Sequence, residues 1–179
     1  MLLDEAEGRI VTLWLADAAA TLYACAIAFR LVRRERLARV AWAAGCAIFL
    51  AHVGFAFQFY HHWSHAEAFR ATARQTEQLF GIDSGFGLYF NYAFAIVWVS
   101  DVLWGGRPRA PWIGVLIHSF LAFMFFNATV VFGKGWVRWA GVVATVALLV
   151  IYGISRRRTS MTLVPVGPVL MSDSKRSKK

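Results

Sequence analysis

The sequence predicts an all-α integral membrane protein, a bundle of five transmembrane helices with one amphipathic surface helix between the second and the third. Of the 179 residues, 59% are hydrophobic and only 16% are charged, whereas an average soluble chain has about 25% charged residues. The hydrophobic residues form five blocks, each close to the roughly 20 residues that one helix needs to cross a bilayer. Basic residues flank these blocks, as they do in membrane proteins of defined orientation.

The five predicted membrane segments follow one another through residues 1–154, which we expect to form a single membrane domain. They cover about residues 10–29, 40–60, 86–104, 112–132 and 136–154. The third and fourth are joined by the tight basic loop 105–111, which contains two glycines and two prolines. The fourth and fifth are separated only by residues 133–135, so we expect them to form an antiparallel hairpin.

Two further stretches lie outside these segments. Residues 64–67 read S-x-x-E, the capping-box pattern of a helix start. Residues 65–80 that follow combine strong helix formers with a charged side, which predicts an amphipathic helix lying along the surface. Residues 155–179 are basic and interrupted by prolines, and we expect them to form a disordered cytoplasmic tail.

The positive charge of the chain predicts its orientation. The net charge is +9, and we expect the arginines of residues 30–39 to fill the first loop. With five crossings, this loop, the basic loop 105–111 and the basic tail share one side, which the positive-inside rule makes cytoplasmic. The N-terminus is then extracytoplasmic and the C-terminus cytoplasmic. We expect the basic inner face to contact anionic lipid, and the position of the charges argues against nucleic-acid binding.

The end of the second segment carries a cluster of histidines. His61, His62 and His65 lie within five residues of one another. If the helix continues through them, His61 and His65 stand at i and i+4 on one face, a spacing at which two imidazoles can hold one metal ion. The sequence therefore predicts a metal site at the extracytoplasmic face, formed by these three histidines and Asp17. Imidazole and carboxylate ligands suit zinc, copper or iron.

Four predicted segments also carry one polar residue each in their outer half. At about 1.5 Å per residue, Asp17, Gln58, Asn91 and Asn127 lie within about 3 to 10 Å of the outer boundary. Polar side chains in hydrocarbon tend to meet, because lipid offers them no hydrogen-bond partner. We expect this polar cluster to support the histidine site. The other interpretation of Asp17 is structural, with its carboxylate bonded only to the neighbouring amides.

The histidines have other interpretations. An interfacial cluster in the aromatic belt requires no metal, and a proton-linked role follows from the near-neutral titration of imidazole. His52 and His118 are the two deep histidines and are candidate axial ligands for a haem b. Their depths differ by about 8 Å, which is awkward for ligands of one iron. His118 could instead pair with Asp101, near the inner boundary, or Asp101 could form a solvated helix end.

The sequence indicates no reaction, since it contains no phosphate-binding glycine loop, nucleophile elbow or catalytic triad pattern, and whether the protein is an enzyme stays open. The leading hypothesis is a metal-binding membrane protein, with redox chemistry as one version of it. The alternative is a non-catalytic accessory or assembly subunit, which docks onto other membrane subunits through its packing faces. A proton-coupled carrier is a third hypothesis, weakened by the absence of an internal repeat.

Overall fold

The computed structural model describes residues 3–161, and their side chains as far as residue 154. In chain order the elements are α1 (Glu5–Leu31), α2 (Glu35–Phe59), α3 (His65–Phe80), α4 (Gly87–Trp104), α5 (Pro111–Phe126), the π-helix η1 (Asn127–Val131) and α6 (Trp136–Met161). The described part of the chain contains no strand. The prediction of an all-α protein is therefore confirmed.

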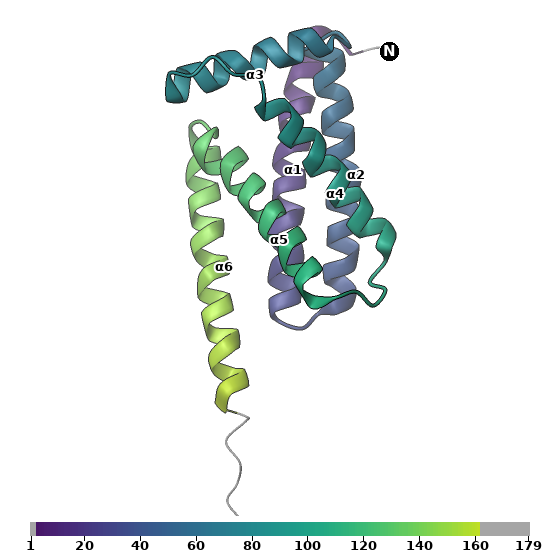
Figure 1. The fold of residues 1–179 in the computed structure, drawn as a ribbon, viewed down its shortest axis with the longest axis vertical. Helices are drawn as coiled ribbons and strands as arrows, with labels where there is room; N and C mark the ends of the chain where they lie inside the picture. Colours follow the sequence, from purple (N-terminus) through teal and green to yellow (C-terminus); the bar gives the residue numbers. More distant parts are fainter. Residues whose placement is uncertain (1–2, 162–179) are drawn as a thin grey trace, which may run out of the picture.

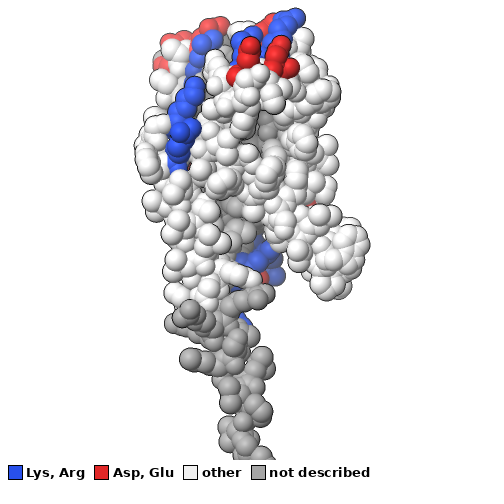
Figure 2. Space-filling model, turned by 60° about the vertical axis from the view of Figure 1, so that its left-hand side comes forward, with Lys and Arg blue, Asp and Glu red and all other residues white. Residues whose placement is uncertain are grey.

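In the described part of the chain, four helical segments are long and apolar enough to cross a membrane. They are α1, α2, the continuous run Pro111–Val131 of α5 and η1, and Trp136–Ile154 of α6. At about 1.5 Å per residue, the 27 residues of α1 extend about 40 Å, more than the hydrocarbon thickness of about 30 Å. Figure 2 shows charged residues gathered at one end of the molecule, above a broad uncharged surface.

Helices α1 and α2 form a closely packed antiparallel pair (Figure 1). Their contact is lined by small buried residues, among them Ala19, Ala26, Ala41 and Gly45. A Cβ atom added at Gly45 would lie 3.3 Å from the Cβ of Leu22 on α1. Small residues let helix backbones approach each other, and dispersion contacts between them stabilise helix pairs inside a membrane.

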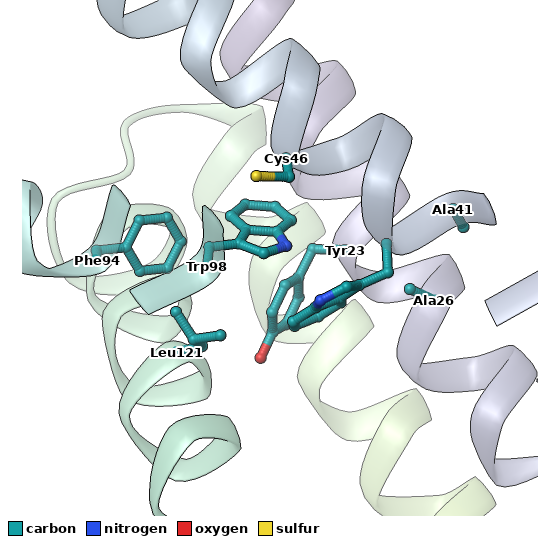
Figure 3. Packing of buried hydrophobic residues seen from close by; sticks show 8 residues of the cluster. Tyr23, Ala26, Ala41, Cys46, Phe94, Trp98 and Leu121 are labelled. Carbon is teal, nitrogen blue, oxygen red and sulfur yellow. The ribbon is translucent and has the colours of Figure 1, made fainter. Parts of the chain in front are cut away.

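An aromatic core joins α4 and α5 to this pair. Trp98 of α4 is fully buried, and its ring centroid lies 5.3 Å from that of Trp42 and 5.8 Å from that of Tyr23. Figure 3 shows Tyr23, Phe94 and Leu121 gathered around it. Because these rings come from α1, α2 and α4, the core fixes the relative position of the helices that line the candidate site.

Helix α3 is separate from α2 and runs across one end of the α1–α2 pair (Figure 1). Helix α2 ends at Phe59, and His62 and Trp63, with left-handed φ angles of 46° and 58°, turn the chain before α3 begins. The side chain of Ser64 then accepts a hydrogen bond from the Glu67 amide at 3.3 Å, which is the serine half of the predicted capping box, while the Glu67 carboxylate pairs with Arg70. Gly81, in the left-handed conformation, ends α3.

Two predicted boundaries are wrong, both next to basic residues. The first loop contains only residues 32–34, because α2 already begins at Glu35 and includes Arg36 and Arg39. Arginine is a good helix former whose aliphatic part can lie along apolar surface, so it does not end a helix. Helix α6 likewise continues through residues 155–161, which were predicted as tail. The rest of the predicted tail, residues 162–179, lies outside the described residues.

We predict that Trp98→Ala lowers the free energy of unfolding by about 3–5 kcal/mol, because it opens a cavity in the aromatic core. Denaturant unfolding of the detergent-solubilised protein, followed by circular dichroism, measures this change. The matched control is Trp112→Ala, since Trp112 is 66% exposed and its loss leaves no buried cavity. An equal effect of the two substitutions would contradict the assigned core.

Candidate functional site

A cavity of about 350 Å³ lies beneath α3, between α1, α2, α4 and η1. We call it the polar cavity, because eight of its lining residues carry polar side chains. These are Asp17, His52, His61, Thr72, Gln75, Asn91, Tyr92 and Thr129. Its other walls are apolar and largely aromatic, including Phe49, Phe57 and Phe125. Five structural elements thus bring polar groups to one partly open cavity.

Asp17 is the acidic residue of the polar cavity, and it interacts electrostatically with His52. Within the described residues no donor forms a hydrogen bond with its carboxylate, and the Thr21 hydroxyl bonds the Asp17 backbone carbonyl instead. His52 Nδ1 lies 2.9 Å from the Thr12 carbonyl oxygen. Since a carbonyl only accepts, Nδ1 carries the proton, and in the neutral imidazole Nε2 is left as an acceptor.

His61 lies just after the end of α2 and also lines the polar cavity. Its ring packs edge-on against Phe57, with ring centroids 5.6 Å apart. Burial lowers the pKa of His61 below its ordinary value of 6.5, Glu67 opposes this shift and His62 adds to it. The imidazole is therefore held mostly neutral at pH 7, when it can both donate and accept a hydrogen bond.

The predicted metal set is not assembled as expected. His61 follows α2 whereas His65 is the first residue of α3, so the prediction that they share one helix face is wrong. His65 Nδ1 lies 3.0 Å from the Tyr92 hydroxyl, and His62 is exposed. In residues 3–161, no group of three or more His, Cys, Asp or Glu side chains is placed to hold a metal ion.

The predicted polar cluster forms in part. Asp17 and Asn91 line the polar cavity together with His61. Gln58 instead points outward, where its carbonyl oxygen accepts a hydrogen bond from the Trp63 indole at 2.7 Å. Asn127 starts the π-helix and donates to the Phe123 carbonyl at 2.8 Å. A side chain whose donor is hydrogen-bonded to a carbonyl of its own helix needs no partner for that donor from a neighbouring helix.

The two deep histidines have no common space for a haem. His52 lines the polar cavity, whereas His118 lines a second cavity between α1, α5 and α6. His118 Nε2 contacts the guanidinium of Arg30. The expected pairing of His118 with Asp101 is absent among the hydrogen bonds of the described residues, because Arg109 forms an ion pair with Asp101. The alternative of a solvated Asp101 is also wrong, since its side chain is only 6% exposed.

Sequence reasoning missed several groups of both cavities. His52, assigned to a haem alternative, faces Asp17, and Thr72 and Gln75 reach the polar cavity only because α3 folds over it. The pairs Arg30–His118 and Asp101–Arg109 join residues on different elements. The sequence signal that could have indicated these pairs is the presence of basic residues in the two loops, at the same expected depth as Asp101 near the inner boundary.

Comparisons with known proteins find no matching family model, no similar curated protein and no similar solved structure. No activity can therefore be transferred to this chain from a relative. A functional hypothesis depends on the chemistry of its cavities and on the placement of its charges.

We predict that His61 makes stability depend on pH. Its pKa is lowered in the folded state, so the unfolded state binds its proton more readily, and stability falls as pH drops through 6.5 toward the folded pKa. His61→Gln should reduce the loss of stability measured by thermal unfolding between pH 7 and pH 5. The control His62→Gln should keep most of this pH dependence, because the burial of His61, which is the main cause of its lowered pKa, is unchanged. Equal pH dependence in wild type and His61→Gln would refute the assignment.

Proposed function

We propose that the protein crosses the membrane five times, with α4 as the additional crossing helix beside the four apolar segments. The long helices alternate in direction along the chain (Figure 1). Helix α4 has 18 residues, about 27 Å in length, close to the hydrocarbon thickness. Its Trp98 lies in the aromatic core, which supports a position for α4 at the same depth as its neighbours.

The proposed orientation places the N-terminus outside and the C-terminus in the cytoplasm. The loops at residues 32–34 and 105–110 lie at the same end and, with the adjacent helix termini, carry many of the arginines. The positive-inside rule assigns that end to the cytoplasm. Helix α3 then lies along the extracytoplasmic surface, with Ala68 and Ala73 buried and Arg70, Arg74 and Glu77 exposed. This pattern supports an amphipathic interfacial helix.

We propose that the polar cavity, in the extracytoplasmic half, binds a small organic cation. The observation that carries the proposal is the Asp17 carboxylate, which lines a cavity within a membrane segment and has no hydrogen-bond partner in the described residues. A carboxylate in hydrocarbon is costly and is typical of functional positions. A protonated amine would supply both the opposite charge and the missing donors.

The remaining walls of the polar cavity favour the same ligand class. Phe49, Phe57 and Phe125 line the cavity, and aromatic walls suit a cation, because the face of an aromatic ring is electronegative. The side chains of Asn91 and Gln75 can orient polar substituents. A volume of about 350 Å³ lies at the lower end of the range of roughly 300–1,000 Å³ for ligand sites.

A transition-metal ion is the second candidate occupant. His52, His61 and Asp17 line the same cavity, and imidazole with carboxylate suits zinc, copper or iron. The described side chains do not converge three at a time on one point, so water or a bound molecule would have to complete the coordination. An extended ligand matches this spread of polar groups better than a single ion does.

We predict that the purified protein binds phenethylamine and that Asp17→Asn weakens this binding about 10- to 100-fold. A charge-assisted hydrogen bond contributes about 1.5–3 kcal/mol, and each 1.4 kcal/mol corresponds to about a tenfold change in affinity. Isothermal titration calorimetry in detergent measures the affinity. The matched variant is Asp83→Asn, since Asp83 is exposed and lies outside the polar cavity.

The neutral isostere 2-phenylethanol is the control ligand and should bind no more tightly to wild type than to Asp17→Asn. Equal amine affinity of wild type and Asp17→Asn would refute the cation proposal. Analysis of zinc, copper and iron in the same preparations tests the second candidate. If the wild-type protein contains stoichiometric metal and the His52→Ala/His61→Ala variant has lost it, the occupant of the polar cavity is a metal ion and not an amine.

A further inference from the structure

A second cavity, about 1,100 Å³ in volume, runs between α1, α5, η1 and α6. We call it the lateral crevice. Its walls are mainly apolar and include Ile27 of α1, Val115 of α5 and Ala144 and Leu148 of α6. Helix α6 contacts the rest of the protein mainly through η1 and part of α1, which leaves the crevice beside it. Its volume exceeds the usual range for small-molecule sites, about 300–1,000 Å³.

The arginine-rich end of the lateral crevice carries a basic group. The Arg109 side chain lines it and pairs with Asp101. Beside it His118 contacts the guanidinium of Arg30, and His118 Nδ1 is buried without a hydrogen-bond partner. Arg30 does not itself line the crevice, but the His118 side chain that it contacts does, so that two guanidinium groups and one carboxylate lie near this end. Figure 2 shows a small basic group in the lower half of the molecule, between uncharged surfaces and away from the charged end.

The lateral crevice is electrically asymmetric along its length. Its acidic residue, Asp17, lies on α1 13 residues before Arg30, which is about 20 Å along the helix. The wall between these two positions is mainly apolar. A ligand that fits this arrangement has an anionic head at the arginine end and a long apolar body. Basic sites between membrane helices at the cytoplasmic side are typical binding sites for anionic lipid head groups.

We propose that the lateral crevice binds one anionic phospholipid. Its phosphate lies at Arg109 and beside His118, which the Arg30 guanidinium contacts, and its acyl chains lie along the groove between α1 and α6. The inference rests on the proposal that these helices cross the membrane. The two cavities share lining residues, among them Asp17, but the proposed head-group contact at Arg109 lies only in the lateral crevice. The site selects the lipid by head-group charge together with the shape of the groove.

Native mass spectrometry of the detergent-solubilised protein tests the head-group contact. We expect phosphatidylglycerol to be retained at least about tenfold better than phosphatidylcholine with the same acyl chains. Asp101→Asn/Arg109→Gln, which removes the ion pair without leaving a buried unpaired charge, should abolish this preference. Arg107→Gln is the control in the same loop, since Arg107 is exposed and does not line the lateral crevice. Equal retention of both lipids by wild type would overturn the proposal.

A second pair of variants tests the groove. Ala144→Phe fills the lateral crevice and should reduce phosphatidylglycerol binding about tenfold, whereas Val143→Phe, on an exposed part of α6, should not. Melting temperatures close to wild type show that each variant is folded. Unchanged binding in Ala144→Phe, or full displacement of the lipid by soluble glycerol phosphate, would contradict a groove-bound lipid. A wild-type protein that binds the amine but retains no phosphatidylglycerol would refute this inference alone.

Discussion

Hydrocarbon offers no hydrogen-bond partner to a polar side chain, so each such group in a membrane segment must find one in the protein, in water or in a ligand. Most polar groups of this chain meet that requirement locally. Asn127, Thr129 and Thr145 bond carbonyl groups of their own helices. Within the described residues, Trp42 Nε1, Trp98 Nε1 and His118 Nδ1 are buried without a hydrogen-bond partner. Asp17 is the acidic group without a hydrogen-bond donor that lines the polar cavity, and it connects the fold to the proposed function.

The packing of the helices determines where the two cavities lie. Small residues bring α1 and α2 into close contact, and the aromatic core around Trp98 holds α4 and α5 against that pair. Helix α6 is attached near η1, where a Cβ atom added at Gly141 would lie 2.7 Å from the Thr129 hydroxyl oxygen. The polar cavity lies on the α3 side of this arrangement, and the lateral crevice opens where α6 diverges from α1.

The lengths of the apolar runs were sufficient to predict the all-α class and the approximate helices, because hydrophobicity over about 20 residues is a strong signal. The histidine geometry could not be predicted, since it depends on left-handed backbone at His62 and Trp63, which interrupts the helical phase. The π-helix at Asn127–Val131 also departs from the α-helical repeat, so the direction of its side chains could not be predicted from α-helical spacing. Asp17, Asn91 and His61 line one cavity, and their similar depth in the sequence was enough to group them, whereas pairs such as Asp101–Arg109 required the tertiary structure.

We infer that a ligand reaches the polar cavity from the extracytoplasmic side, beneath α3. Cysteine labelling of cells with a membrane-impermeant thiol reagent tests it most directly, in a background without Cys25 and Cys46. Ala95 lines the cavity, and its neighbour on the same helix, Ala93, does not. We expect Ala95→Cys to react from the outside and to be protected by phenethylamine, while Ala93→Cys stays unreactive. Equal labelling of both positions, or no labelling of Ala95→Cys, would contradict it.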